Sequence, residues 1–207
     1  MVNGFIIKCI HSVVQTILNS EEEIESLDRA IGDGDHYINI KRGSMAVQSI
    51  ESELTSLPPD QAFKKIGMTL MTSVGGASGP LFASFFLALA KEIKSETNLQ
   101  QFSKGFTSGV KSIMDRGKSK LGDKTMLDVL IPVSEKLQSL ANERSEKQKL
   151  IKEIDLVAMA GVIATKDMMP SKGRSAGLAE RAIGHIDPGA KTCQLIISTV
   201  CNELKLN

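Results

Sequence analysis

Hydrophobic residues recur along most of this chain at intervals of three and four positions, the spacing of one face of an α-helix. The pattern predicts amphipathic helices across 5–17, 63–74, 81–89 and 102–113. Thr192–Leu206 is rich in β-branched residues, but its apolar positions keep the helical period over about four turns, so we expect a helix there too. Period-two alternation, which is typical of half-buried strands, is hard to find. The pattern therefore predicts an all-α fold of eight helices, packed as an antiparallel bundle.

Residues that cap or break helices fall between these hydrophobic stripes. Asp60 stands where a helix N-cap belongs, and Pro80 stands where a first-turn proline belongs. No repeat period or low-complexity linker divides the chain, so we expect one domain over residues 1–207. The predicted breaks are Leu57–Asp60, Gly75–Pro80, Gly117–Asp123 and the long polar passage Pro170–Gly189.

Composition narrows the class of protein. Hydrophobic residues make up 42% of the chain and charged residues 24%, as in ordinary soluble domains, and the net charge of +1 gives no electrostatic footprint for nucleic acid or a membrane. We therefore expect neither of those partners. Cys9, Cys193 and Cys201 are an odd number without CxxC spacing, which indicates reduced thiols. With no leader sequence and no apolar stretch long enough to span a bilayer, the chain is expected to be cytoplasmic.

Three aspartates, Asp28, Asp33 and Asp35, stand within eight residues near the N-terminus. Three carboxylates at close range repel one another unless a cation or raised pKa values relieve them. Mg²⁺ takes oxygen ligands, typically one or two carboxylates plus phosphate oxygens, so the cluster indicates the metal end of a nucleotide-phosphate site. Gly32 and Gly34 would let the chain turn tightly enough to aim these carboxylates inward. The alternative is that the two Asp-Gly pairs simply form turns.

Two further segments could contact a nucleotide. Gly75–Pro80 is poor in side chains and runs into an apolar helix, whose free N–H groups and positive dipole end favour anions. An ordinary turn between two helices would have the same sequence. Gly122–Asp128 combines a turn with a helix start and places two polar side chains beside the flexible Met126. A capped surface helix explains the same residues.

The long passage Pro170–Gly189 is another candidate, because long ordered loops in compact domains are often functional. Arg174 carries the forked guanidinium that clamps phosphate, and Asp187-Pro188-Gly189 predicts a rigid turn. The alternative for this passage is a solvated loop. His11 falls within a predicted helix and is interpreted as structural, whereas His36 adjoins the acidic cluster and is expected near the phosphates.

Five motifs follow one another along the chain: Ile31–His36, Gly75–Phe82, Gly122–Asp128, Gly173–Ser175 and His185–Gly189. In this order they resemble the nucleotide-binding L subunit of dihydroxyacetone kinase, and the match covers the whole chain. The resemblance implies a barrel of eight amphipathic antiparallel helices with the nucleotide site at one end. It also implies two Mg²⁺ ions that bridge the nucleotide phosphates to Asp28, Asp33 and Asp35.

The same resemblance implies which residues surround bound ADP or ATP. The residues at the family's phosphate-binding positions are His36, Tyr37, Ile38, Asn39, Ala77 and Ser78. The residues at the positions around the rest of the nucleotide are Gly117, Met126, Arg174, Asp187, Pro188 and Gly189. Arg174 is the candidate phosphate stabiliser, and no residue is identified as a general acid or base. Tyr37 is a departure, because the family commonly has glycine after the motif histidine.

A function follows from the resemblance. A separate L subunit is similar to the phosphotransferase-system branch of the family, in which a phosphohistidine M subunit recharges bound ADP and the phosphoryl group passes to dihydroxyacetone on a K subunit. Such a phosphotransferase would act by positioning phosphate and neutralising its charge. Two alternatives stay open. The chain could be an ATP-dependent kinase component for another small hydroxyketone or sugar, or an ADP-sensing module that binds a transcription regulator.

Overall fold

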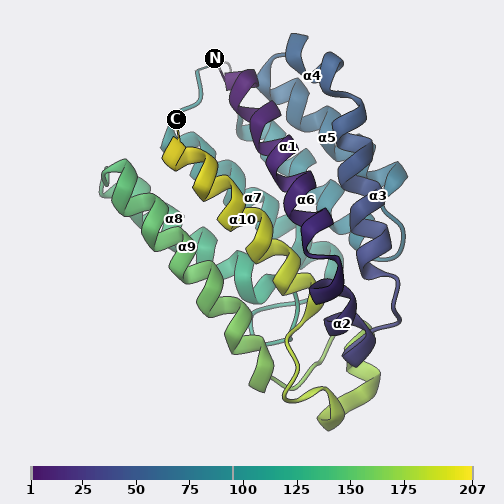
Figure 1. Cartoon of the computed structure of the whole chain (residues 1–207). Coiled ribbons are helices and arrows are strands. Elements are labelled where there is room, and N and C mark those ends of the chain that lie inside the picture. Colours follow the sequence, from purple (N-terminus) through teal and green to yellow (C-terminus); the bar gives the residue numbers. More distant parts are fainter. Residues whose placement is uncertain (1, 95, 207) are drawn as a thin grey trace.

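The computed structural model describes residues 2–94 and 96–206, and every regular element within these ranges is a helix (Figure 1). The prediction of an all-α fold is confirmed, and the five predicted helical segments correspond to α1, α5, α6, α7 and α10, with Val74 just past the end of α5. The α-helices are α1 (Val2–Asn19), α2 (Glu21–Ile31), α3 (His36–Ser49), α4 (Glu51–Ser56), α5 (Pro59–Ser73), α6 (Ser78–Glu92), α7 (Leu99–Gly117), α8 (Leu127–Asn142), α9 (Lys147–Ala164) and α10 (Pro188–Leu206). Two 3₁₀ helices, η1 (Thr165–Asp167) and η2 (Arg174–Ala182), connect α9 to α10.

Two helix starts differ from the sequence prediction. Helix α5 begins at Pro59, so Asp60 lies inside its first turn and the prediction that it is the N-cap is wrong. Helix α10 begins at Pro188, four residues before Thr192, and takes over the end of the passage predicted as a loop. Proline suits this position because the first helical N–H has no partner within the helix. Pro80 does lie in the first turn of α6, as predicted.

The longer helices pack in a continuous series. Helix α1 contacts α3, α3 contacts α5, and contacts then follow chain order from α5 through α6, α7, α8 and α9 to α10. Helix α10 lies beside α1 again (Figure 1). Buried hydrophobic side chains form one cluster from α1 to α5 and a second from α6 to α10. Phe63, Phe82 and Phe86 pack against both clusters and so join them.

One end of this helix series carries the segments that the sequence analysis singled out. Both termini lie at the opposite end, and α1 runs from there to α2 (Figure 1). The link from α2 to α3, the segment before α6, the segment before α8 and the start of α10 all border one cavity at the α2 end. Residues far apart in sequence therefore meet where the helices begin and end.

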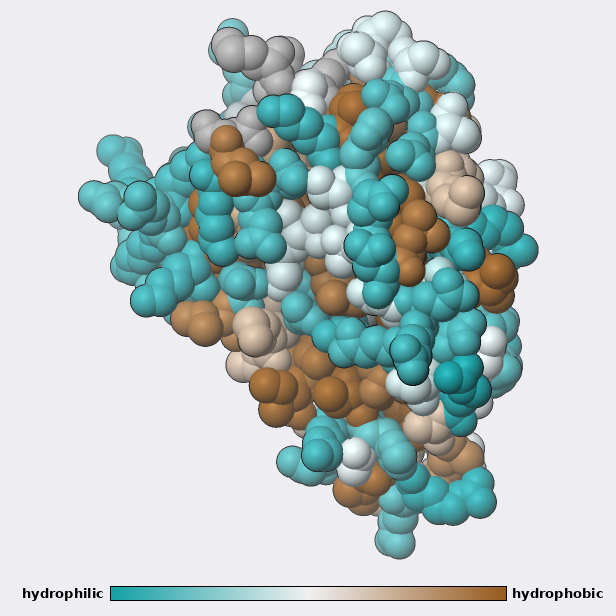
Figure 2. All heavy atoms as spheres, viewed as in Figure 1, coloured by the Kyte–Doolittle hydropathy of each residue, from teal (hydrophilic) through white to brown (hydrophobic). Residues whose placement is uncertain are grey.

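Helix α9 carries a stripe of exposed hydrophobic side chains. Leu156, Met159 and Ile163 are exposed at positions i, i+3 and i+7, so they share a helix face. Figure 2 shows hydrophobic surface gathered over the lower part of this helix. None of the three residues borders the cavity at the α2 end. Within the described residues, no helix is both long enough and apolar enough to cross a membrane.

Candidate functional site

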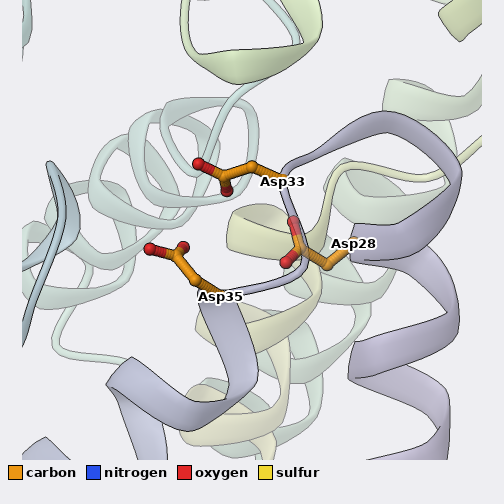
Figure 3. A group of neighbouring side chains, drawn as sticks. All are labelled: Asp28, Asp33 and Asp35. Atoms are coloured by element: carbon orange, nitrogen blue, oxygen red, sulfur yellow. The ribbon is translucent and has the colours of Figure 1, made fainter.

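Asp28, Asp33 and Asp35 come together as the sequence predicted. Asp28 belongs to the last turns of α2, Asp33 to the link after it, and Asp35 precedes α3, and the three carboxylates point toward one another (Figure 3). One oxygen from each lies within 4.8 Å of the other two. Asp28 is buried and its Oδ2 accepts a hydrogen bond from the His36 N–H at 3.0 Å, while Asp33 and Asp35 keep part of their surface exposed. This all-oxygen donor set suits a hard divalent cation.

Glycine makes this arrangement possible at two positions. A Cβ atom on Gly32 would lie 1.8 Å from Oδ1 of Asp28, so only glycine lets the link pass over that carboxylate. Gly34 has a φ of +79°, a conformation that L side chains rarely adopt, and it turns the chain between Asp33 and Asp35. The Asp-Gly pairs therefore form turns and also gather the carboxylates, so the two interpretations of the sequence are compatible.

The glycine-rich segment before α6 forms a neighbouring wall. A Cβ atom on Gly75 would lie 2.4 Å from Oδ1 of Asn39, and one on Gly76 would lie 3.8 Å from Oδ2 of Asp35. The segment thus passes close to the acidic cluster. Helix α6 begins at Ser78, so the positive end of its dipole and its first N–H groups face the same region.

A cavity of about 420 Å³ lies between these segments. Its size falls within the roughly 300–1,000 Å³ of small-molecule sites. The predicted site residues that border it are Asp28, Asp33, Asp35, His36, Asn39, Ala77, Ser78, Gly117, Met126, Arg174, Asp187, Pro188 and Gly189. Tyr37 and Ile38 are the two predicted site residues that are not among its lining residues.

The side chains of Tyr37 and Ile38 are used elsewhere. Tyr37 is buried, and its hydroxyl donates to Oε2 of Glu21 at 2.9 Å. Burial, together with the hydrogen bond to Glu21, raises the pKa of Tyr37 to about 12. The Ile38 side chain is exposed to solvent. Both residues lie in the first turn of α3, where main-chain N–H groups lack helical partners, so only their main chain is placed to serve the site.

His36 is buried beside the acidic cluster. Burial lowers its pKa, although the neighbouring carboxylates oppose that shift. Its Nε2 lies 2.9 Å from Oγ1 of Thr192. Because the Thr192 hydroxyl donates its proton to the Pro188 carbonyl at 3.0 Å, it accepts from His36 Nε2–H. His36 therefore ties the start of α3 to the start of α10.

Arg174 reaches the acidic cluster from the start of η2. Its Nε donates to Oδ2 of Asp33 at 2.8 Å. The side chains of Arg174 and Asp33 are 68% and 39% exposed, so solvent screens this pair and its contribution to stability is small. Gly173, with a φ of +73°, turns the chain just before η2. Arg174 is thus an exposed cation at the cavity edge, paired with Asp33.

Asp187 caps a helix, whereas the sequence predicted a rigid turn at this position. Its Oδ2 accepts from the Ala190 N–H at 2.7 Å, so it caps α10, and Pro188 and Gly189 are already helical. The predicted rigid turn over these residues is therefore wrong. Burial raises the pKa of Asp187 to about 7, and the nearby Lys124 ammonium opposes the shift.

Lys124 also borders the cavity and was not among the predicted site residues. Asp128, four residues further on, is buried in the first turn of α8, and its carboxylate accepts from the N–H groups of Gly122 and Thr125 at 2.5 and 2.7 Å. This pattern folds 122–128 into a compact turn instead of a capped surface helix. The only sequence feature that could have indicated a site role for Lys124 is its position between the turn and helix-start residues of Gly122–Asp128.

Comparison with known proteins agrees with this geometry. The DAK2 domain family matches residues 30–202. The chain is 37% identical to the PEP-dependent dihydroxyacetone kinase 2, ADP-binding subunit DhaL, of Listeria innocua, over 91% of this chain and 89% of the relative. It is 36% identical to the PEP-dependent dihydroxyacetone kinase, ADP-binding subunit DhaL, of Escherichia coli, over 91% of each.

Longer proteins contain a similar domain. The chain is 29% identical to human triokinase/FMN cyclase, over 95% of this chain but 34% of the relative. It superposes on the crystal structure of the dihydroxyacetone kinase from C. freundii in complex with AMP-PNP and Mg²⁺ with a TM-score of 0.73 and 24% identity, over 95% of this chain and 33% of that one. The chain spans about a third of each of these two, and the structural match shows a shared fold. By sequence, it belongs to the DAK2 domain family of phosphotransferases, together with the ADP-binding subunits of dihydroxyacetone kinases.

Proposed function

We propose that this chain is the ADP-binding subunit of a phosphoenolpyruvate-dependent dihydroxyacetone kinase. It would relay a phosphoryl group from a phosphohistidine M subunit, through bound ADP and ATP, to dihydroxyacetone on a K subunit. The observation that carries the proposal is that three carboxylates and a glycine-rich helix start border the same cavity. Four relatives at 36–38% identity support the proposal: three are named as ADP-binding subunits of PEP-dependent and one of PTS-dependent dihydroxyacetone kinase, and the matches cover about nine-tenths of their length.

Asp28, Asp33 and Asp35 would hold two Mg²⁺ ions. Their oxygens are close enough to share a cation, and a cation would relieve the repulsion among three carboxylates. Metal and nucleotide, when bound, would supply the transferable phosphoryl group and neutralise its charge. The N–H groups of Tyr37 and Ile38 in the first turn of α3, and the segment with Ala77 and Ser78, would orient the phosphates. His36 and Asn39 would border the phosphates with their side chains, since their own N–H groups donate to Asp28 and to the Asp35 carbonyl. Gly117, Met126, Arg174 and Asp187–Gly189 would surround the rest of the nucleotide.

Arg174 would stabilise phosphate charge. Its guanidinium lies at the cavity edge and is held only by an exposed pair with Asp33. Divalent cations at the acidic cluster would compete for Asp33 and release Arg174 toward the phosphates. The chain's own contribution is therefore positioning and charge, and His36, whose Nε2 is engaged with the Thr192 hydroxyl, is assigned no general-base role.

For the architecture we propose one domain over residues 1–207, built as a barrel of eight amphipathic antiparallel helices. Contacts that run in order through α1, α3, α5 and onward to α10, and from α10 back to α1, support this arrangement. Helices α2 and α4 would then be short connections at the barrel ends. The nucleotide would close the α2 end, where the cavity lies.

Binding of ADP tests the site directly. Chain freed of nucleotide by dialysis against a chelator should bind ADP with Mg²⁺ in calorimetry. Asp33→Asn should weaken this binding at least tenfold, which is about 1.4 kcal/mol, because a metal ligand loses its charge. Asp60→Asn, on α5 and away from the cavity lining, is the matched control and should change the affinity less than twofold. Unchanged affinity in Asp33→Asn would refute the metal assignment.

Retention of the nucleotide tests the relay. With K and M subunits, phosphoenolpyruvate and the general phosphotransferase proteins, labelled ADP should stay bound through many turnovers, since several phosphate contacts slow its release. An ATP-dependent kinase component is the second candidate, favoured by the similarity to triokinase/FMN cyclase. Rapid exchange of the label with free ATP during turnover would support that candidate instead.

A further inference from the structure

Lys124 is a buried cation that the proposed reaction does not use. Its side chain is 0% exposed and is the largest fully enclosed side chain in the described part of the chain. Its φ of 59° lies in the left-handed region, which costs an L residue roughly 1–2 kcal/mol. Burying an ammonium group costs more unless every proton finds a partner. A lysine held in this way has contacts strong enough to offset both costs.

Those contacts are main-chain carbonyls of another part of the site. The Lys124 Nζ donates to the carbonyl oxygens of Thr165 at 2.5 Å, His185 at 2.6 Å and Lys166 at 3.3 Å. An ammonium has three protons, so all three are used. Thr165 and Lys166 belong to η1, directly after α9, where the helix dipole is negative. Their carbonyls also accept from the N–H groups of Met168 and Gly184. The lysine therefore binds the end of α9 and the approach to α10 at once.

The same residues fix where α10 begins. The Asp187 N–H donates to Oγ1 of Thr165 at 3.1 Å, and the Gly184 N–H donates to the carbonyl of Lys166 at 2.8 Å. Asp187 then caps α10, and the Cβ of Met126 lies 3.7 Å from the position that a Cβ on Gly189 would take. Lys124, two residues before Met126, thus joins two walls of the cavity through one side chain.

We propose that Lys124 is a positioning residue for the nucleotide. It holds Asp187–Gly189 against Met126 through the carbonyls of Thr165, Lys166 and His185, and it leaves the metal and phosphate end to other residues. This inference rests on the proposed function, because it requires the cavity to take a nucleotide. It follows that Lys124 matters for ligands that fill this part of the cavity and not for ligands that need only the acidic cluster.

Two probes separate these parts of the site. ADP with Mg²⁺ engages the whole cavity, whereas inorganic pyrophosphate with Mg²⁺ engages only the metal and phosphate end. Lys124→Met keeps the length of the side chain but removes its donors, so it should weaken ADP binding at least tenfold and change pyrophosphate binding less than twofold. Lys120→Met, an exposed lysine of the same segment, is the matched control and should change both less than twofold.

A second variant covers the case in which Lys124→Met does not fold. Thr165→Val preserves shape and removes the hydroxyl that accepts from the Asp187 N–H. It should weaken ADP binding severalfold and again spare pyrophosphate. An equal loss of affinity for both probes would show a general folding role. No loss of affinity for either probe would show that the contact between Thr165 and Asp187 does not affect binding. Either result, in a folded variant, would overturn the proposal.

Amide hydrogen exchange tests, without any ligand, the contacts that link Lys124 and Thr165 to the start of α10. In Lys124→Met or, if that variant is unfolded, in Thr165→Val, the amides of 185–190 should exchange faster than in the unaltered chain, while those of 28–39 should not. Unchanged exchange at 185–190 would overturn the positioning role. If the unaltered chain binds neither probe, the proposed function fails, and this measurement still decides whether the contacts of Lys124 and Thr165 fix the start of α10.

Discussion

Gly32→Ala should disable the acidic cluster without removing any carboxylate. The added Cβ would lie 1.8 Å from Oδ1 and 2.9 Å from the carbonyl oxygen of Asp28, distances that atoms in proteins do not tolerate. Asp28 is 3% exposed and cannot swing into solvent without breaking its hydrogen bond from the His36 N–H. The substitution therefore moves either the Asp28 carboxylate or the link that carries Asp33.

The expected cost follows from that hydrogen bond. A bond to a charged group contributes about 1.5–3 kcal/mol, so the ligand-free protein should lose stability of that order. For a chain of this size, 1 kcal/mol corresponds to roughly 2–4 °C, which predicts a fall in Tm of roughly 3–12 °C. Restoring Asp28 to the cluster on metal binding would cost a similar amount, so affinity for ADP with Mg²⁺ should fall about 10- to 150-fold.

A double-mutant cycle assigns the effect to one contact. Thermal melting of ligand-free protein should show a lower Tm for Gly32→Ala in the unaltered chain. The loss should be smaller in an Asp28→Ala background, where the carboxylate is absent and only the 2.9 Å approach to the main-chain carbonyl remains. Gly177→Ala, where a Cβ would meet nothing within 4 Å, is the control and should leave Tm unchanged. An equal loss with and without the Asp28 carboxylate would refute this reasoning.

Three other predictions use the same purified chain. ADP at about 100 times its Kd, with Mg²⁺, should add roughly 2.7 kcal/mol to the free energy of unfolding, and a melting temperature indifferent to ADP, Mg²⁺ and chelator would contradict a nucleotide site. Arg174→Gln should change the Tm of the ligand-free protein by no more than about 2 °C, because the ion pair between Arg174 and Asp33 is exposed. The same variant should slow phosphotransfer with K and M subunits. Equal rates in the variant and the unaltered chain would argue against a contact between Arg174 and phosphate. Asp187 has a folded-state pKa of about 7, above its unfolded value of 3.8, so the stability it contributes is present below pH 3.8 and is lost as pH rises to about 7. The Tm of Asp187→Asn relative to the unaltered chain should therefore rise between pH 4 and pH 7.5, and a constant difference would contradict the raised pKa.

Much of the fold could be predicted because helical spacing is a local signal. The stripes that include Ile17, Leu89 and Ile113 lie in helices, and these side chains are buried. The acidic cluster could also be predicted from the sequence, since its three residues are close along the chain and glycines flank them. Asp60 was misjudged because Pro59 starts the helix, so the N-cap is Pro58 and the aspartate lies two residues after it.

The remainder of the site depends on contacts between distant segments. Nothing near Lys124 in the sequence shows that its partners are carbonyls about 40 and 60 residues away. Asp187-Pro188-Gly189 has the composition of a turn, and only its packing beside Thr165 shows that the aspartate caps a helix. The family resemblance identified Tyr37 as a nucleotide-site position, whereas its side chain contacts Glu21.

That contact gives the chain an optical property. Tyr37 is the only tyrosine, and the chain has no tryptophan. Near-ultraviolet fluorescence of the unmodified protein therefore arises mainly from one ring, which is buried, bound to Glu21 and two residues from Asp35. Any event that shifts α2 against the start of α3 changes the surroundings of that ring. Metal and nucleotide titrations at the acidic cluster can thus be followed by intrinsic emission, with no dye or label attached to the chain.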